Sequence, residues 1–289
     1  RVGVPFVGGA LVDVRNAVES GDAYSERLNS GAVALGSGSV GGVGVSLLAA
    51  GGTQMGAFTV GLGSAAASSG AGLKSGSVSV WFETDGTGTS GLSKEVVGSQ
   101  MVQVYGRVYR LASGSLLSGG VGLWNGSTVE LGAIREGGSF ALSALEVRNV
   151  AEAADGYSEK LNGVFTGGGL LGSGSGSVTQ LEAGQVSAGA MLVGLGSGTF
   201  GSAGVQVGSL GVEFASDGTG TSGLAAVSVG TLSLNVRGTV YRMAEAVLSS
   251  GSLDLGAVRA GRAVGAVGAG SFEVRNGAAM DGYSDLLAV

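Results

Sequence analysis

Cysteine and histidine are both absent from this chain of 289 residues. Without cysteine it has no disulfides and no thiolate metal sites, and without histidine it lacks the commonest general base and metal ligand. An enzyme would then need a carboxylate pair or a Ser/Lys arrangement, but the carboxylates are scattered along the chain. We therefore expect no enzymatic activity, no catalytic residues and no cofactor.

Charge is also scarce, since 12% of residues are charged and the net charge is −6. This balance excludes the basic surface that binds nucleic acid or anionic lipid. No apolar run approaches the length of about 18 residues that a membrane-spanning helix needs. Arg1 opens the chain without a signal peptide, so we expect a processed product or an internal fragment. An acidic, Gly/Ser/Thr-rich, lysine-poor composition is typical of bacterial surface proteins, which predicts an extracellular or cell-surface location.

Proline occurs once, at Pro5, whereas glycine supplies 61 residues. Such a mixture is compatible with a low-complexity coil. However, 44% of residues are hydrophobic and many alternate with small polar ones, a pattern that disordered chains lack. Gly/Ser-rich turns between short apolar strands fit the composition better.

The chain repeats itself. The phrase Val-Arg-Asn stands at 14–16, 147–149 and 274–276, and "DGTGTSGL" stands unchanged at 85–92 and 217–224. The step is about 130 residues, which is the size of a domain rather than of a solenoid coil or propeller blade. We divide the chain into repeat 1 (1–111), which lacks its first strand, repeat 2 (112–243) and a partial repeat 3 (244–289), which has only its first strands.

Within a repeat, hydrophobic residues alternate with period two. In "SVSVWFETDG" (77–86), Val78, Val80 and Phe82 share one face of a strand. Half-buried strands separated by Gly/Ser/Asp turns predict an all-β protein of tandem Ig-like antiparallel β-sandwich domains. The two helix candidates are 151–161 and 278–287, and glycine interrupts both.

The order "LDLGAVRAG", "FEVRN", "LEAG…VGLG", "SGSVSVWFETDGTGTSGL" and "VYGRVYR" resembles the choice-of-anchor D type repeats of bacterial exported proteins, relatives of the Ig-like modules of the abnormal-spindle/hydin class. Leu255-Gly256, Asn276, 181–184 and 204–208 occupy the places of that family's short motifs. The chain lacks the proline that commonly follows one of its strands. The resemblance implies an Ig-like sandwich used in arrays on exported proteins, and it carries over no catalytic residue.

Asp85 and Asp217 open the repeated "DGTGTSGL" string. An aspartate with neighbouring threonine hydroxyls and carbonyls is a calcium candidate, because Ca²⁺ prefers six to eight oxygen ligands. Each loop offers a single carboxylate, however, and the alternative is a tight Asp-Gly turn followed by a loop. The turn interpretation is favoured.

The string "GYSEKLN" places Tyr157, Glu159 and Asn162 together, and Tyr24, Glu26 and Asn29 stand at the same places in repeat 1. An aromatic ring beside a carboxylate and an amide is one way to bind sugar. Their recurrence favours packing instead, because packing must be reproduced in each repeat. Elsewhere, Arg110 and Arg242 each follow a tyrosine, and we expect them to pair with an acidic residue of a neighbouring repeat.

Repetition without catalytic chemistry predicts a structural subunit of an extracellular bacterial filament or surface fibre. A sandwich that lacks an edge strand exposes unpaired backbone, and the spare strands at the C-terminal end would fill that edge in the next copy by strand addition. The residues expected to mediate this head-to-tail self-assembly are Leu253, Leu255, Val258, Phe272 and Val274. A variant is one window on a longer covalent array, and the alternative is a stalk-borne adhesin module whose loops bind glycan or a host surface.

Overall fold

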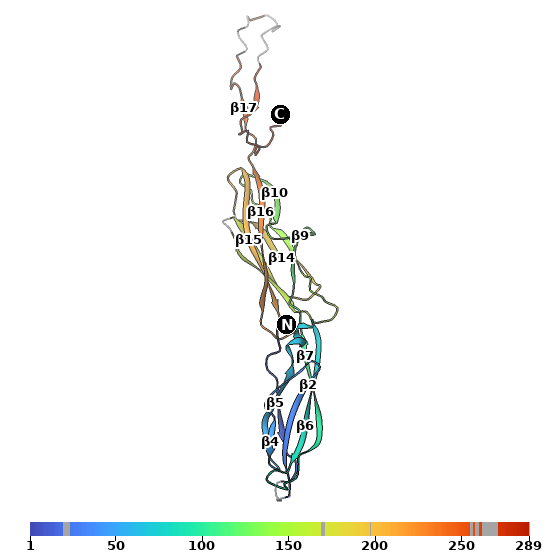
Figure 1. The fold of residues 1–289 in the computed structure, drawn as a ribbon. Helices are drawn as coiled ribbons and strands as arrows, with labels where there is room; N and C mark the ends of the chain where they lie inside the picture. Colours follow the sequence, from blue (N-terminus) through green and yellow to red (C-terminus); the bar gives the residue numbers. More distant parts are fainter. Residues whose placement is uncertain are drawn as a thin grey trace.

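The structure of the chain, a computed structural model, describes residues 1–19, 24–168, 171–196, 198–254, 257, 260–261 and 271–288. The molecule is an extended rod of β-strands. A first sandwich forms one end, a second sandwich forms the middle, and a short two-stranded ribbon lies beyond it (Figure 1). The N-terminus lies where the two sandwiches meet, and the C-terminus lies beside the ribbon. The predicted all-β class of tandem Ig-like sandwiches is confirmed.

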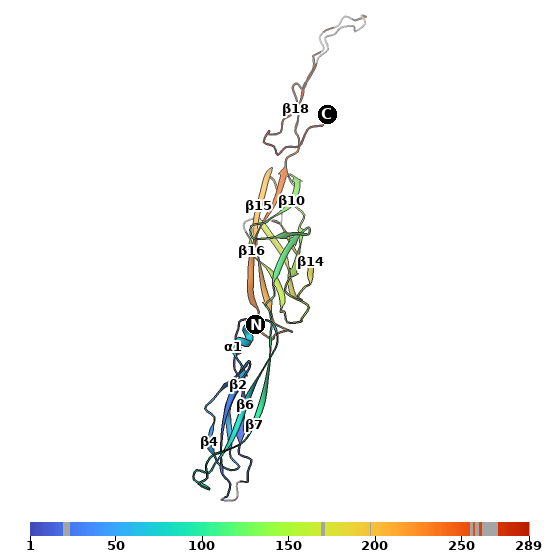
Figure 2. The same ribbon diagram turned by 45° about the vertical axis from the view of Figure 1, so that its right-hand side comes forward.

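The first sandwich has two sheets, one of order β1-β5-β3 and one of order β4-β2-β6-β7, and every pair within them is antiparallel. Its strands are β1 (Ala10–Arg15), β2 (Arg27–Leu35), β3 (Gly38–Gly41), β4 (Val45–Leu48), β5 (Thr53–Leu62), β6 (Gly72–Asp85) and β7 (Glu95–Val108). The two long strands β6 and β7 run along the rod and lead toward the second sandwich (Figure 2).

The second sandwich is a single sheet of order β10-β16-β15-β12-β13-β14-β11-β8-β9, folded so that its two halves face each other. Its strands are β8 (Gly114–Ser118), β9 (Val121–Leu123), β10 (Thr128–Arg135), β11 (Ser143–Asn149), β12 (Lys160–Gly168), β13 (Gly172–Leu181), β14 (Val186–Leu195), β15 (Gly204–Asp217) and β16 (Val227–Tyr241). All its pairs are antiparallel except β10 with β16, which is parallel. The sequence did not indicate this parallel pair.

Strand β13 joins the two halves, because its first part pairs with β14 and its last part pairs with β12. In the first sandwich the same stretch is split into β3 and β4, which pair with β5 and β2. The bend between the two parts has glycines in the left-handed region, with φ of 109° at Gly42, 78° at Gly44 and 85° at Gly176. Glycine adopts this conformation without the strain that other residues carry.

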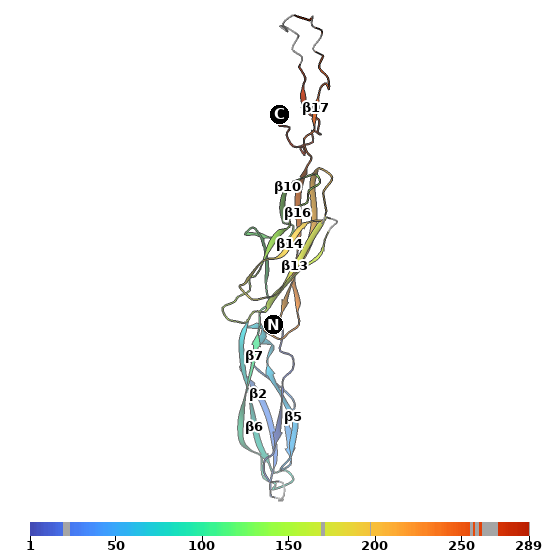
Figure 3. The same ribbon diagram turned by 180° about the vertical axis from the view of Figure 1, so that it is seen from behind.

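The ribbon at the far end consists of β17 (Ala246–Leu248) and β18 (Val274–Asn276). Their pairing matches that of β8 with β11, since Leu248 lies opposite Val274 as Leu116 lies opposite Val147. Figure 3 shows the ribbon from behind, at the end of the rod away from the first sandwich.

Neither helix candidate of the sequence is helical in the structure. Both stretches turn at a glycine with positive φ, 72° at Gly156 and 84° at Gly282, which a right-handed helix does not accommodate. The described part of the chain instead has one short helix, α1 (Ser64–Ser68). No helix of that part is long and apolar enough to cross a membrane.

The second sandwich has the larger core. Its buried cluster is Ala112, Leu116, Val129, Phe140, Leu145, Val147, Leu161, Val178, Met191, Val193, Leu195, Leu210, Val212, Phe214, Leu234, Val236 and Val240. The cluster of the first sandwich is Val14, Val45, Ala57, Phe58, Val60, Val78 and Val80. The two repeats therefore share a fold but differ in how completely it is closed.

Candidate functional site

The joint between the two sandwiches is formed by the end of β7 and the turn that precedes β12. The backbone N–H of Arg110 donates to the carbonyl oxygen of Tyr157 at 2.8 Å, and the N–H of Glu159 donates to the carbonyl oxygen of Arg110 at 3.0 Å. The Arg110 guanidinium contacts the Asp155 carboxylate at 2.6 Å. The rings of Tyr109 and Tyr157 lie 5.7 Å apart between centroids. Backbone, charged and aromatic contacts thus act on the same few residues.

A buried carboxylate lies beside these contacts. Glu159 is 0% exposed, and the Nε of Arg1 donates to both of its oxygens at 3.0 Å. The Ser216 hydroxyl donates to the same carboxylate at 2.7 Å, and so does the Ser222 hydroxyl. Burial opposes ionisation of Glu159 more than any other effect, but the hydrogen bonds from Arg1, Ser222 and Ser216 together hold its pKa below the usual value. The carboxylate is therefore charged at neutral pH.

The same joint recurs between the second sandwich and the ribbon. The N–H of Arg242 donates to the carbonyl oxygen of Tyr283 at 2.9 Å, and the Arg242 guanidinium contacts Asp281 at 2.6 Å. The rings of Tyr241 and Tyr283 lie 6.3 Å apart. The prediction that Arg110 and Arg242 pair with an acidic residue of a neighbouring repeat is confirmed.

The second joint also has a counterpart of the contact between Arg1 and Glu159, and it is made by an arginine at the end of β10. Arg135 Nε lies 2.7 Å from the Asp285 carboxylate, which is the counterpart of the contact between Arg1 and Glu159. The two pairs differ in burial. The side chains of Arg135 and Asp285 are 70% and 30% exposed, whereas those of Arg1 and Glu159 are 16% and 0% exposed. The first joint is therefore the one that depends on a buried charge.

Acid should loosen these joints. The Arg110 guanidinium lowers the pKa of Asp155, and the Arg242 guanidinium lowers that of Asp281. A carboxylate with a lowered pKa stabilises the folded form above its unfolded pKa, about 4, and this stabilisation is lost as the pH falls through the folded value. We expect small-angle X-ray scattering to show a wider range of particle shapes as the pH falls below the unfolded pKa of about 4, and the original curve to return on neutralisation.

The same titration has an internal control. The chain has no histidine, so no side chain with an ordinary pKa changes charge between roughly pH 6 and 8. The scattering curve should be constant across that interval. A change of shape centred there would contradict the assignment of the joints to the carboxylates.

The asparagine of the Val-Arg-Asn phrase shows why the phrase recurs. The Asn149 side-chain amide donates to the carbonyl oxygens of Glu159 and Leu181 at 3.2 and 3.1 Å. Its own oxygen accepts from the N–H of Ser113 at 3.2 Å. Asn149 is 0% exposed, so this one amide satisfies buried backbone groups of three separate segments.

Its two counterparts make the corresponding bonds. Asn16 donates to the carbonyl oxygens of Glu26 and Leu48 at 3.2 and 3.0 Å, and Asn276 donates to the carbonyl oxygen of Asp285 at 2.9 Å. In each of the three copies, the asparagine therefore bonds the end of a strand to the residue at the place of Glu159.

Asp85, a calcium candidate of the sequence, holds a bend of the backbone. Its carboxylate accepts from the N–H of Thr87 at 2.9 Å and from the side-chain amide of Asn29 at 2.7 Å, and Lys94 lies 3.4 Å away. The Asn29 oxygen accepts from the N–H of Leu47 at 2.7 Å. Leu47 has a φ of 54°, so the chain of bonds fixes a residue in the left-handed region.

Asp217 is placed in the same way. It accepts from the Thr219 N–H at 2.8 Å, from the Asn162 amide at 2.9 Å and from the Gln180 amide at 2.5 Å. The Asn162 oxygen accepts from the N–H of Gln180, whose φ is also 54°. Hydrogen bonds, led by those from Thr219, lower the pKa of Asp217. We call each Asp–Asn–backbone set a clip.

The clips support the turn interpretation of "DGTGTSGL". Among the described residues, no three acidic, histidine or cysteine side chains gather as metal ligands. Calcium binding at Asp85 and Asp217 stays the less favoured alternative of the sequence analysis, and the following substitution tests it.

Replacing Asn29 with alanine removes the acceptor of the Leu47 N–H and a donor to Asp85. We expect the free energy of unfolding of the first sandwich to fall by about 1–3 kcal/mol, as for a buried polar group left unsatisfied. Leu47→Gly, which removes the side chain at positive φ, should be neutral or stabilising by up to about 1 kcal/mol. Urea unfolding in calcium and in EDTA should give the same values, and a stabilisation seen only in calcium would instead support the metal site.

The sugar-binding interpretation of "GYSEKLN" fits the structure less well. Tyr157 packs against Tyr109, Glu159 is buried against Arg1, and Asn162 belongs to the second clip. These side chains serve separate contacts and do not converge on one opening. In the first sandwich the corresponding tyrosine, Tyr24, is 91% exposed.

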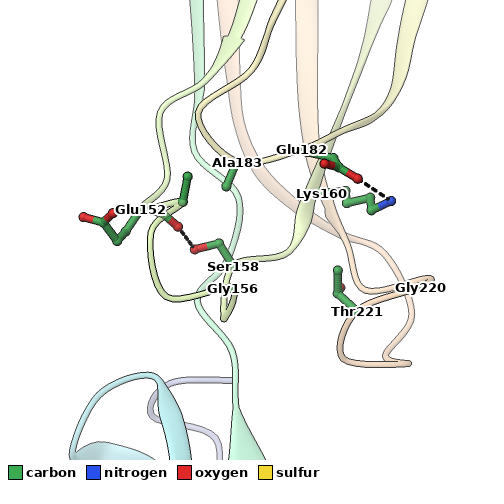
Figure 4. A pocket seen from close by; sticks show the side chains of 9 residues that line it. Glu152, Gly156, Ser158, Lys160, Glu182, Ala183, Gly220 and Thr221 are labelled. Carbon is green, nitrogen blue, oxygen red and sulfur yellow. Dashed lines mark hydrogen bonds and ion pairs between the residues drawn. The ribbon is translucent and has the colours of Figure 1, made fainter.

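A shallow pocket lies at the end of the second sandwich that faces the first (Figure 4). Lys160 and Glu182 form an ion pair of 3.3 Å on one side, and the Ser158 hydroxyl donates to the carbonyl oxygen of Glu152 at 2.5 Å on the other. Thr221, from the loop 217–224, closes the rim. Its lining is mainly polar, with the hydroxyls of Ser158 and Thr221 beside the ion pair.

The two sandwiches differ at two edges. In the second, β8 pairs with the outer edge of β11 and β10 pairs with the outer edge of β16. Across the described ranges of the first, β1 pairs with β5 alone and β7 pairs with β6 alone. Two long edges of backbone hydrogen-bonding groups therefore face outward.

Of the residues predicted to mediate self-assembly, Leu253 and Phe272 are 45% and 56% exposed, and Val274 is partly buried in β18. Leu255 and Val258 lie outside the described residues. The prediction omitted Leu248 of β17, which is 51% exposed. Its signal in the sequence was the match of "VLSSGS" (247–252) to "SLLSGG" (115–120), which puts Leu248 at the place of Leu116.

No family model and no curated protein matches the chain. Solved structures with a similar arrangement include CfaE, the adhesive subunit of the CFA/I fimbria of enterotoxigenic Escherichia coli, at 9% identity and a TM-score of 0.30 over 81% of this chain and 94% of that one. A Porphyromonas gingivalis W83 protein of unknown function shares 12% identity at a TM-score of 0.27, over 78% and 87% of the two chains. Cadherin-like domains 1 to 4 of zebrafish RET share 12% at 0.21, over 75% and 42%.

Proposed function

We propose that the chain is a structural segment of an extracellular bacterial fibre or stalk, in which Ig-like sandwiches are joined in series. The observation that supports this most is the joint, whose tyrosine pair, arginine–aspartate pair and backbone bonds occur twice along the rod. Because the same contacts recur at both joints, successive repeats are connected in the same way.

The joint is also directional. Repeats 1 and 2 each end in a Tyr-Arg sequence, and repeats 2 and 3 each contribute an acidic turn to the contact, so its two faces differ. A contact between unlike faces does not close on itself and leads to an open series. Repeats joined in this way are expected to form an extended rod whose two ends differ, and the chain in Figure 1 is an extended rod.

We base the proposed extracellular or cell-surface location on the sequence, which has no cysteine, is acidic and is poor in lysine. The resemblance to choice-of-anchor D type repeats points the same way and is part of this proposal. A glycan-binding adhesin module is the second candidate. Only the loop 85–92 would serve it as an outer tip, because Ser222 and Thr221 of the loop 217–224 lie in the joint.

Electron microscopy of the purified chain tests the proposal. We expect straight particles in which the two sandwiches keep one angle, and bent particles when Arg110→Ala and Tyr157→Ala remove the charged and aromatic contacts. Arg148→Ala is the matched control, because Arg148 is an exposed arginine of β11 outside the joint. A broad range of angles in the unmodified chain would overturn the proposal, and specific capture on a glycan array would favour the adhesin.

A further inference from the structure

The outer face of the first sandwich carries aromatic and hydroxyl side chains on neighbouring strands. Strands β2, β6 and β7 lie side by side there (Figure 2), with β6 in the middle. Val78 and Val80 of β6 point into the core, where they are 0% and 3% exposed. The residues that alternate with them point outward, because successive side chains of a strand lie on opposite faces of its sheet. Trp81 is one of these, so its indole lies on the solvent side of the sheet, and the residue is 40% exposed.

The indole packs on a glycine of the neighbouring strand. Gly31 of β2 lies opposite Trp81, and a Cβ atom at Gly31 would lie only 2.3 Å from the Cζ2 atom of the ring. The ring occupies this place because residue 31 has no side chain. Ser99 of β7 lies opposite Trp81 on the other side. The indole therefore rests on the backbone of β2, and both of its partners in the ladder are too small to cover it.

The second sandwich does not repeat this arrangement. Glu213 of β15 stands at the place of Trp81, and its partner on β12 is Val164 rather than a glycine. Val80, next to the indole, does recur as a buried valine of the second sandwich. The fold therefore requires the core residue but not the indole. An exposed tryptophan that the fold does not require suits a binding role, because tryptophan is enriched among the residues that dominate binding energies.

A row of serines leads from the indole along β6. Ser75, Ser77 and Ser79 point to the same side of the sheet as the indole, and within the described part of the chain their hydroxyls have no hydrogen-bond partner. On β7, Tyr105 lies opposite Ser75 and Gln103 lies opposite Ser77. At about 3.3 Å per residue, these groups extend about 20 Å from the indole. Hydroxyl and amide groups are therefore available to a ligand along that length.

The row ends at a pocket of about 390 Å³ beside the loop 217–224. Tyr105 and Tyr109 line the pocket, and Tyr105 is 65% exposed. Arg107 lines it too, with an exposed side chain that pairs with no carboxylate among the described residues. Thr221 adds a hydroxyl from the loop. The pocket thus joins aromatic rings and hydroxyls to a positive charge that the described chain does not neutralise.

We propose that this face, which comprises the outward residues of 73–81 and 99–107 together with the pocket, binds a linear oligosaccharide that carries a carboxylate. The C–H groups of a sugar ring stack on the electron-rich face of an aromatic ring, so Trp81 holds one sugar and the tyrosines of the pocket hold another. The Arg107 guanidinium binds the carboxylate by charge-assisted hydrogen bonds. The serine and glutamine side chains bond to the sugar hydroxyls between these two places.

A protein partner fits the face less well. An apolar protein surface would bury the three serine hydroxyls without partners, and each buried hydroxyl left unsatisfied costs stability. A saccharide offers them both donors and acceptors, and its carboxylate complements the charge of Arg107. The inference adds a ligand to the proposed structural role and does not depend on that role.

Binding of the full chain to an array of linear oligosaccharides tests the inference. The probes carry uronic acid units, and each is matched by a probe whose carboxylates are reduced to alcohols. We expect capture of the acidic probes and weaker capture of the reduced ones, with apparent dissociation constants read from a protein titration. Trp81→Glu, which installs the residue of the second sandwich, should weaken capture by about tenfold or more. Gly31→Val should act in the same way, because the new side chain displaces the indole.

Two further variants separate the parts of the face. Arg107→Thr, which again installs the residue of the second sandwich, should abolish the preference for the acidic probes and leave capture of the reduced ones unchanged. Trp124→Glu is the matched control, because it removes the other tryptophan, which is 68% exposed and belongs to the second sandwich. Capture by this variant should equal that of the unmodified chain.

Absence of capture would overturn the inference, and so would equal capture of acidic and reduced probes. Capture that survives Trp81→Glu, as a site on the loop 85–92 would give, would also overturn it. Light scattering of the ligand-free chain provides another test, since a molar mass that falls with Trp81→Glu would make the face a contact between copies. Straight particles without capture would leave the proposed function standing, whereas bent particles with capture that Trp81→Glu abolishes would remove that function and keep this inference.

Discussion

Leu161→Ala is expected to lower the free energy of unfolding of the second sandwich by about 3–5 kcal/mol, because it leaves a cavity in a closed core. Leu161 is 0% exposed and belongs to the large buried cluster. The equivalent change in the first sandwich, Leu28→Ala, should cost only about 1–2 kcal/mol, since Leu28 is partly exposed and water already reaches the site.

The two tryptophans allow the sandwiches to be followed separately. Trp81 lies in β6 of the first, and Trp124 follows β9 of the second. Urea unfolding monitored by fluorescence, with one or the other replaced by phenylalanine, assigns each transition. Equal losses for the two leucine variants would contradict the incomplete closure of the first sandwich.

Arg1→Ala is the second change with a large expected effect. It removes the cation from a carboxylate that is 0% exposed in the unmodified chain and leaves two serine hydroxyls as its side-chain donors. Breaking a buried ion pair by removing one partner typically costs about 3–5 kcal/mol, and we expect about 3 kcal/mol here because the Arg1 side chain is itself 16% exposed. Urea unfolding at neutral pH measures the loss.

Arg135→Ala provides the control at the same place in the next repeat. Its partner Asp285 is 30% exposed and Arg135 is 70% exposed, so the loss should stay below about 1 kcal/mol. The cost of Arg1→Ala should also shrink in acid, since protonation of Glu159 removes the unpaired charge. Equal costs for both arginines, or a cost of Arg1→Ala that grows as the pH falls, would contradict the buried ion pair.

Much of the fold follows from local patterns in the sequence. The alternation around Val78 and Val80 predicts a half-buried strand, and both residues are buried in β6. The arginines that follow the tyrosines, Arg110 and Arg242, predicted the charged contacts of the two joints, because a contact needed in several repeats recurs in their sequence. What these patterns share is that each lies within a few residues of the chain.

The rest depends on contacts between distant residues. Arg1 meets Glu159 across 158 positions, and nothing near either residue indicates the other. Asn29 was grouped with its neighbours Tyr24 and Glu26, whereas its partners are Asp85 and the backbone of Leu47. The parallel pairing of β10 with β16 was missed for a similar reason, since period two fixes the faces of a strand but not its neighbour or direction.

The chain enters the second sandwich at β8 from one joint and leaves it at the end of β16 into the other. A pull applied between the two ends of the rod therefore draws β16 lengthwise past β15, with which it makes an uninterrupted ladder over most of its length. The backbone hydrogen bonds between β15 and β16 are therefore loaded at the same time and do not break one after another from a free end. The same pull also draws β8 along β11, where the ladder has four residue pairs, so we expect that shorter ladder to yield first.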